Sequence, residues 1–393
     1  MLRANNYLIF LFLSITCALF IIHLLAGDIY PPPWDDEASF LFLAKGILKN
    51  GVPLHAAVEG GSPLLVRPAG FHLLLSLWIL FFGDSLAIIR LLPFLLSILT
   101  LFLLLLISKE IVSLEKEKKE CHKGVVCLIY LVPVWGFFSP PLILQANMAR
   151  SDFLVAFLGV LSCYLLLKNQ PLKSILTALF AFNFHFYAVF ALLPAFLGVL
   201  SFKALTPKSF TKKNKLNLNF WIAVAIGALI TIYSASWFVL NYQIFFKHLL
   251  IDLAKRKEGT FATGFSWIAV LAFGLLIGFL FFQKKNFKAL VLFLYSLFFM
   301  IAYLFQGNFG PWYAVYFFIG FSLMCLSFII QRKESISLLT AFSLLPAFLL
   351  FSVYYKSGFK IAYGGITFAP FAQYLSKKDK KEFLKEVRKL VGV

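Results

Sequence analysis

The sequence contains little charge. Only 13% of its 393 residues are Asp, Glu, Lys or Arg, and only 17 of these are acids. Hydrophobic residues make up 61% of the chain, and the mean hydropathy is +0.89. A chain of this composition cannot surround one core with a solvated surface. The composition therefore excludes a soluble globular protein and indicates an integral membrane protein.

Two further absences narrow the function. The five cysteines lack the paired spacing that disulfides or metal sites use. No P-loop, no G-x-G-x-x-G fingerprint and no soluble nucleotide-binding domain is visible, so the sequence favours a lipid-linked substrate over a nucleotide-linked one. The net charge of +19 is not arranged as an aromatic and basic surface, so nucleic-acid binding is not expected. We attribute this charge to loop orientation and to contact with anionic lipid headgroups.

Long apolar runs recur along the whole chain. About 20 apolar residues suffice for a helix to cross the hydrocarbon core of a bilayer. The first run, residues 7–26, exceeds the apolar region of a signal peptide and is interpreted as a retained span. Residues 174–202 are too long for one span and are predicted to form two short helices that turn near 183–187. Clear spans are predicted at residues 7–26, 87–107, 125–140, 153–167, 220–240, 265–282, 289–305, 312–330 and 336–355.

The lysines and arginines orient these spans. They concentrate in four stretches that the positive-inside rule assigns to the cytoplasm, residues 108–124, 201–217, 283–288 and 331–335. A crossing at residues 70–84 would contradict this assignment, so that stretch is predicted to be a helix in the outer membrane interface. Eleven crossings result, with the amino terminus inside the cell and the carboxyl terminus outside.

The predicted fold is therefore an all-α polytopic membrane protein. Residues 1–355 form one transmembrane domain, with a first outer loop at 27–86 that contains interfacial helices. Residues 356–393 form a short extracytoplasmic tail.

Three acids follow the first span. The stretch "PPPWDDEASF" (31–40) contains Asp35, Asp36 and Glu37. One interpretation is that Asp35 or Asp36 caps a second helix, with Glu37 at its positive end. One cap needs only one acid, however, and the residues that follow have the balance of an interfacial helix. Carboxylates held at that depth are partly desolvated, which suits them to accept a proton.

A second outer group lies in "QANMARSDFLVAF" (145–157). Asp152 could merely cap the span that follows, and Arg150 could merely reach toward lipid headgroups. An arginine two residues from an aspartate is also a phosphate donor beside an orienting acid. Arg67 and Arg90 are predicted at the same outer level and could meet the same anionic group. Several cations and several acids at the same membrane depth indicate a binding or catalytic site for an anionic group.

His185 lies near the predicted outer turn. It could contact a phosphate or an acceptor, but a histidine packed between aromatic side chains is more often structural, and we favour that interpretation. The sequence does not decide whether a divalent metal assists.

Three stretches together resemble a known family. They are "WDDEASFLFLAKGILKNG", "RPAGFHLLLSLWILFFGDSLAIIRLLPFLLS" and "ARSDFLVAFLGVLSCYLLL". They are similar to consecutive signatures of the bacterial relatives of protein O-mannosyltransferases, which include the lipid A aminoarabinose transferase and have the GT-C fold. The resemblance covers about the first 170 residues, and "GNFGPWYAVYF" (307–317) resembles a later outer segment of the family.

The resemblance implies a glycosyltransferase at the outer face of the cytoplasmic membrane. Such an enzyme takes one sugar from a polyprenyl-phosphate carrier and passes it to an acceptor hydroxyl of a glycolipid, glycan or protein, inverting the anomeric centre. Asp36 matches the catalytic acid of the family, and Asp152 matches the acid after its third span. The additional Asp35 leaves the register of the base open by one residue, and the family's often large carboxyl-terminal domain is reduced here to the short tail.

Another class of function fits the composition. A transporter or a lipid-linked sugar flippase would also be polytopic, but it would carry ionisable residues at mid-membrane on broken helices, often in two related halves. The acids here lie at the ends of spans, and the sequence shows no obvious internal repeat. A channel or scaffold subunit would leave the three acids unexplained except as caps.

Overall fold

The structure, a computed structural model, describes residues 14, 16, 17, 20, 35–53, 68–117, 123–137, 142, 145–205, 218–243, 246, 286–304 and 313–331. The predicted spans 265–282 and 336–355, the tail, and all but four residues of span 7–26 lie outside these ranges.

Every regular element in the described ranges is a helix. In chain order they are α2 (Asp35–Asn50), α3 (Gly70–Phe82), α4 (Leu86–Glu117), α5 (Lys123–Phe137), α7 (Asp152–Leu167), α8 (Pro171–Ala181), the 3₁₀ helix η1 (Phe186–Ala188), α9 (Val189–Leu205), α10 (Leu218–Leu240), α12 (Phe287–Leu304) and α13 (Ala314–Gln331).

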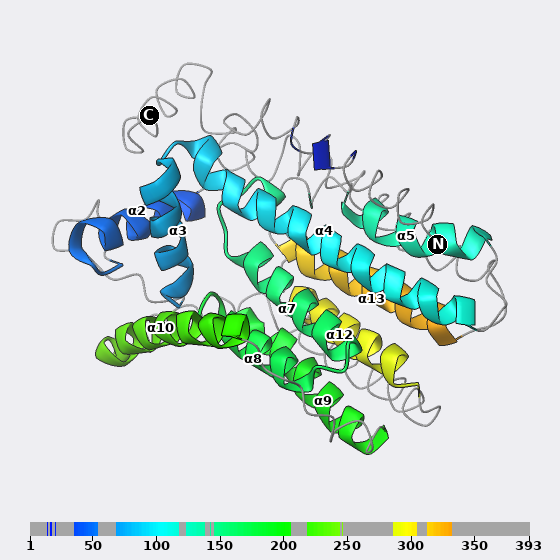
Figure 1. Cartoon of the computed structure of the whole chain (residues 1–393). Helices are drawn as coiled ribbons and strands as arrows, with labels where there is room; N and C mark the ends of the chain where they lie inside the picture. Colours follow the sequence, from blue (N-terminus) through cyan, green and yellow to red (C-terminus); the bar gives the residue numbers. More distant parts are fainter. Residues whose placement is uncertain are drawn as a thin grey trace.

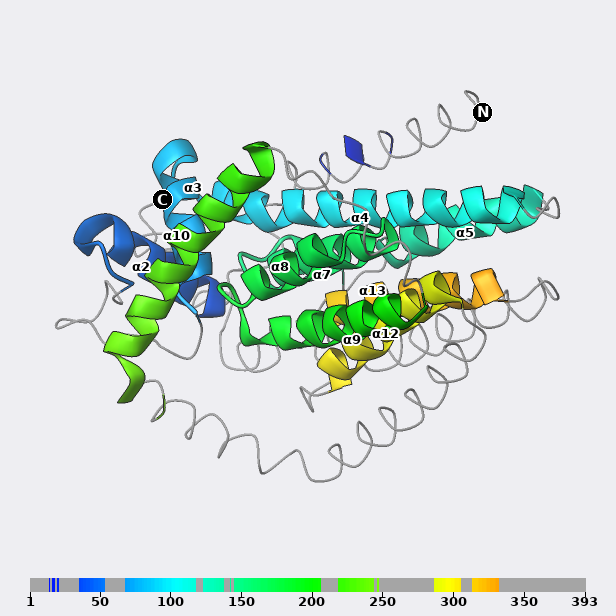
Figure 2. The same ribbon diagram turned by 60° about the horizontal axis from the view of Figure 1, so that its bottom comes forward.

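Most of these helices form one bundle. Figures 1 and 2 show α4, α5, α7, α8, α9, α12 and α13 running side by side in roughly one direction. Helices α2 and α3 lie together at one end of this bundle, and α10 crosses it obliquely near the same end. We call this the α2–α3 end. Helices α4, α7, α9 and α13 all begin there, so the first turns of these four helices lie at the same end of the bundle.

The predicted spans agree with helices wherever the structure describes them. Two helical stretches are long and apolar enough to cross a membrane, Leu86–Ser113 with 28 residues and Phe186–Leu205 with 20. Shorter apolar helices cover Asp152–Leu167, Phe287–Tyr303 and Val315–Ile330, where spans were also predicted. The total of eleven crossings and the sides of the membrane remain predictions.

The long stretch 174–202 is divided, as its length predicted. Helix α8 ends at Ala181, and α9 begins at Val189 after the short η1. Residues 70–82 form a separate helix, α3, and Gly83, with a φ of +98°, caps its carboxyl-terminal end. Its placement in the membrane interface stays a prediction.

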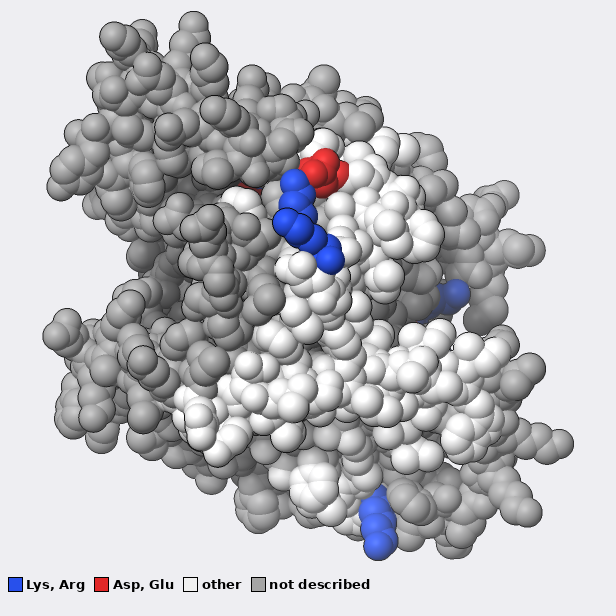
Figure 3. All heavy atoms as spheres, turned by 90° about the vertical axis from the view of Figure 1, so that its left-hand side faces the viewer, with Lys and Arg blue, Asp and Glu red and all other residues white. Residues whose placement is uncertain are grey.

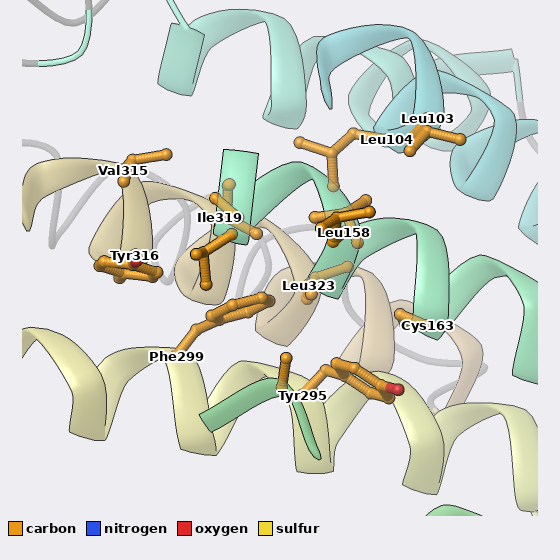
Figure 4. Close-up of a cluster of buried hydrophobic side chains, with 14 of the residues drawn as sticks. Leu103, Leu104, Leu158, Cys163, Tyr295, Phe299, Val315, Tyr316, Ile319 and Leu323 are labelled. Atoms are coloured by element: carbon orange, nitrogen blue, oxygen red, sulfur yellow. The ribbon is translucent and has the colours of Figure 1, made fainter. Parts of the chain in front are cut away.

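An apolar core joins α4, α7, α12 and α13. Leu104, Leu158, Phe299 and Ile319, one from each helix, are buried and point toward one another (Figure 4). At Gly159 the two helices α7 and α12 approach so closely that an added Cβ would lie 2.6 Å from Phe299 Cζ. Close packing of this kind fixes the positions of α7 and α13, whose first turns face the α2–α3 end.

Ion pairs tie the helices together at the opposite end. The Glu110 carboxylate on α4 accepts a hydrogen bond from Lys168, which follows α7, and one of 2.8 Å from Lys288 Nζ on α12. The hydrogen bond to Glu110 raises the pKa of the Lys168 ammonium above its usual value. The two ends of the bundle thus carry separate groups of charges.

Candidate active site

The segment 145–152, which leads into α7, is buried throughout. Gln145 Oε1 accepts the backbone N–H of Val315 at 2.8 Å, which ties the segment to the first turn of α13. The Ala149 N–H donates to Glu37 Oε1 at 2.8 Å, which ties it to the first turn of α2. The 145–152 segment therefore holds the starts of three helices together.

Glu37 and Arg90 form a buried ion pair between α2 and α4. Arg90 Nε donates to Glu37 Oε1 at 2.9 Å, and Arg90 Nη2 donates to Oε2 at 2.7 Å. The Arg90 side chain is 0% exposed and that of Glu37 is 2% exposed. A planar guanidinium fits a carboxylate in this two-bond geometry, which fixes orientation as well as charge. With the Ala149 N–H as third donor, Glu37 anchors the start of α2.

Helix α2 brings the other two acids to the same end. It begins at Asp35, so all three acids occupy its first turn, where the helix dipole favours negative charge. The helix ends at Asn50. Gly51 follows it with a φ of +73°, which suits glycine, and the Gly51 N–H donates to the Ile47 carbonyl at 2.8 Å. The backbone of Asp36 therefore adjoins the Glu37 anchor, while the side chains of Asp35 and Asp36 lie outside the description.

Arg150 and Asp152 form a second buried ion pair. Arg150 Nε donates to Asp152 Oδ2 at 2.8 Å. Arg150 Nη2 lies 3.3 Å from the Tyr313 hydroxyl oxygen, and its guanidinium carbon lies 5.3 Å from the centroid of the Tyr313 ring. This is the range of a cation–π contact. Asp152 sits in the first turn of α7, where the dipole favours its charge.

Three tyrosines, Tyr187, Tyr313 and Tyr316, pack beside Arg150 and form what we call the tyrosine cluster. The rings of Tyr313 and Tyr316 are stacked at 18° with centroids 6.3 Å apart. The Tyr187 ring lies 5.2 Å from that of Tyr313 and 5.8 Å from that of Tyr316. The cluster joins η1 to the start of α13 and supports the guanidinium of Arg150.

His185 positions one member of this cluster. Its Nδ1 accepts the backbone N–H of Tyr187 at 3.1 Å, which caps η1, and its ring packs edge-on against the Tyr187 ring at 4.8 Å. The aromatic packing that the sequence analysis favoured is observed. Contact of His185 with a phosphate stays a proposal.

A close backbone contact holds the turn before η1 against α3. The Gly70 N–H donates to the Asn183 carbonyl oxygen at 2.9 Å, and a Cβ at Gly70 would lie 2.3 Å from that oxygen. The Asn183 side chain donates to Thr231 Oγ1 at 3.0 Å, which links the same turn to α10. Only glycine at position 70 allows this approach.

The predicted residues gather at the α2–α3 end as far as the structure describes them. Glu37, Arg90, Arg150, Asp152 and His185 are all buried there. Figure 3 shows that the described surface at this end is mostly uncharged. The four charged members of the group are buried. Arg67 lies outside the described residues.

The sequence analysis did not single out the tyrosine cluster or the Ala149 amide. Tyr313 and Tyr316 fall within "GNFGPWYAVYF", and Tyr187 falls within the predicted outer turn, so a signal was present. In a chain with 49 phenylalanines and 15 tyrosines, however, aromatic residues alone do not mark a site. Within the described ranges no group of three or more His, Cys, Asp or Glu side chains is placed to hold a metal ion.

Comparison of the sequence with known protein families and with curated proteins finds no match. Comparison with solved structures does. The chain is similar to the crystal structure of ArnT from Cupriavidus metallidurans bound to undecaprenyl phosphate, with a TM-score of 0.57 and 12% identity, over 88% of this chain and 63% of ArnT. The apo structure of the same ArnT gives a TM-score of 0.51 and 11% identity, over 89% of this chain and 64% of ArnT.

The chain thus spans less than two thirds of the length of ArnT. At this level of identity the likeness shows a shared fold, the helical GT-C type that the sequence analysis expected.

Proposed function

We propose that this protein is an inverting glycosyltransferase of the outer face of the cytoplasmic membrane, which moves one sugar from a polyprenyl-phosphate carrier to an acceptor hydroxyl. One observation carries the proposal: two buried ion pairs, Glu37 with Arg90 and Arg150 with Asp152, meet through the adjacent residues 149 and 150 at one end of the bundle. The fold supports it, because the ArnT of the same fold was solved with undecaprenyl phosphate bound.

Asp36 is the proposed general base. Glu37 accepts three hydrogen bonds from Arg90 and Ala149, so it serves to hold α2 in place, and the carboxylate beside it is the better candidate to accept a proton. Asp35 is the alternative by one residue.

The proposed reaction is a single nucleophilic displacement at the anomeric carbon of the sugar. The acceptor hydroxyl gives its proton to Asp36 while its oxygen forms a bond to the anomeric carbon. The bond from that carbon to the phosphate oxygen breaks, and the polyprenyl phosphate leaves with the electron pair. Attack on the face opposite the leaving group inverts the anomeric centre.

Arg150 is the proposed cation for the departing phosphate. Its guanidinium is oriented by one oxygen of Asp152 and by Tyr313, whereas the guanidinium of Arg90 forms the two-bond pair with Glu37 that holds α2 in place. Asp152 orients the guanidinium, and Arg67, Arg90 and His185 are further candidates for contact with the phosphate.

The position of the charges favours transfer over transport. Among the described residues, the buried Asp, Glu, Lys and Arg side chains are Glu37, Arg90, Arg150 and Asp152, and all four lie at the α2–α3 end. A transporter or flippase needs such groups near mid-membrane.

The test compares envelope glycolipids and glycoproteins by mass spectrometry in cells that lack the protein and in cells that carry wild type or a variant. Asp36→Asn keeps the size and most of the capping capacity of the side chain but removes the base. We expect transfer to fall by at least about 100-fold with membrane abundance unchanged. Asp35→Asn is the matched control and should be milder.

Near-normal transfer by both single variants and by the double variant would remove general-base catalysis from this helix start. A larger loss from Asp35→Asn would instead move the base by one residue. An envelope that is identical with and without the protein would contradict the transferase itself.

A further inference from the structure

Two buried polar atoms near Arg150 lack hydrogen-bond partners in the described part of the chain. One is Asp152 Oδ1, the oxygen that Arg150 does not use, and the other is the hydroxyl of Tyr316. Asp152 is 1% exposed and Tyr316 is 0% exposed. Buried polar groups almost always have a partner, so each such group calls for a physical explanation.

The two groups belong to one neighbourhood. Asp152 binds Arg150, Arg150 contacts the Tyr313 ring, and Tyr313 stacks on Tyr316. They come from the first turns of α7 and α13, which the 145–152 segment holds together.

Their chemistry is complementary. A carboxylate oxygen only accepts hydrogen bonds, whereas a tyrosine hydroxyl donates one. A single O–H group can accept from Tyr316 and donate to Asp152. A group that only donates leaves the Tyr316 hydroxyl hydrogen without an acceptor, and a group that only accepts leaves Asp152 Oδ1 without a donor.

We propose that Asp152 Oδ1 and the Tyr316 hydroxyl together form a recognition point for one hydroxyl of the transferred sugar. This inference rests on the proposed function, in which Arg150 meets the phosphate. The sugar is bonded directly to that phosphate. Its hydroxyls therefore lie no farther from the phosphate-binding guanidinium of Arg150 than about the width of one sugar ring.

Burial makes this point selective. Hydrogen bonds in a dry site are stronger than in water, and a buried group left without a partner costs free energy. A site built to bind a hydroxyl therefore rejects a sugar that lacks it. Asp152 and Tyr316 would thereby determine which sugar is transferred.

The test uses purified full-length protein and two kinds of probe. One is undecaprenyl phosphate, and the other is undecaprenyl phosphate that carries glucose, mannose or aminoarabinose, from which the sugar that wild type binds most tightly is chosen. Tyr316→Phe keeps the ring and its stacking and removes only the hydroxyl. We expect its affinity for the sugar-bearing carrier to fall about tenfold, with the affinity for undecaprenyl phosphate unchanged within about twofold.

A second arm uses monodeoxy versions of the chosen sugar. Removal of one particular hydroxyl should weaken binding to wild type more than it weakens binding to Tyr316→Phe, because the variant has already lost one of the two hydrogen bonds to that hydroxyl. Tyr295→Phe is the matched control. Tyr295 is also fully buried, but its hydroxyl lies 2.6 Å from Ser162 Oγ, away from the site, and its loss should leave sugar preference as in wild type.

Equal binding of the sugar-bearing carrier by wild type and Tyr316→Phe would mean that water satisfies the two atoms and would overturn the inference. Equal losses for both probes would also overturn it, because they indicate a general structural defect. Wild type that binds none of the carriers would contradict the proposed function as well, so the two failures can be told apart.

Discussion

Glu37 and Arg90 lie 53 residues apart in the sequence, yet their side chains form two hydrogen bonds of 2.9 and 2.7 Å in the interior. This pair connects the helix that carries the proposed base to the long helix α4. Its loss should therefore disturb stability before it disturbs chemistry.

Glu37→Gln should lower the free energy of unfolding by about 3–5 kcal/mol, because it leaves the buried Arg90 charge uncompensated. Thermal or denaturant unfolding in detergent measures the change. Asp84→Asn is the control, since Lys45 and Asp84 form a 2.6 Å pair whose side chains are 27% and 41% exposed. That variant should cost no more than about 1 kcal/mol. Equal effects of the two substitutions would show that Glu37 does not anchor α2.

Arg150→Lys should weaken the binding of undecaprenyl phosphate by about tenfold, measured with purified protein. Lysine keeps the charge but lacks the planar guanidinium, whose Nε and Nη2 contact Asp152 and the Tyr313 hydroxyl at the same time. The cation is therefore no longer held in one orientation. Lys168→Ala removes a cation at the opposite end of the bundle and should leave the affinity unchanged. An unaltered affinity in Arg150→Lys would indicate that another cation, not Arg150, binds the phosphate.

Gly70→Ala should destabilise the protein and reduce transfer, because the new Cβ would lie 2.3 Å from the Asn183 carbonyl oxygen and would push α3 away from the turn before η1. Gly227→Ala is the matched control. Its Cβ would lie 3.5 Å from the Phe180 ring, an ordinary contact, so no loss is expected. Unfolding temperature and activity should be measured for both, and a tolerated Gly70→Ala would mean that this junction gives way easily.

Cysteine labelling tests the predicted topology. The span count places the tail outside the cell, whereas its lysines favour the cytoplasm. In a background without native cysteines, Lys389→Cys should react with an impermeant thiol reagent in intact cells. Lys203→Cys, at the end of α9 that is predicted to be cytoplasmic, should react only after lysis. Protection of position 389 until lysis would show that the spans are miscounted.

The sequence predicts the helices well because a span is a local property. Uninterrupted apolar runs identify α4, α7, α12 and α13, and the excess length of 174–202 predicts its division at η1. The pairing of Glu37 with Arg90 could not be predicted in the same way. Both residues are recognisable as members of an outer group, but which cation meets which acid depends on how α2 crosses α4.

The tyrosine cluster was missed for a related reason. Tyr187 and Tyr313 are far apart in the sequence, and they meet only because η1 and the start of α13 lie at the same end of the bundle. A sequence rich in aromatic residues gives no local sign of such a meeting.

The length of helix α4 can be compared with the thickness of a bilayer. Arg90 and Glu110 both belong to this helix, and at a rise of 1.5 Å per residue their separation is about 30 Å, which equals the thickness of the hydrocarbon core. With α4 as a transmembrane span, as the sequence predicts, the pair of Arg90 with Glu37 and the cluster of Glu110 with Lys168 and Lys288 would lie at two opposite membrane boundaries. In the proposed function, a carrier lipid with its phosphate at headgroup level would then reach Arg150, which lies beside the Glu37–Arg90 pair, without leaving its leaflet.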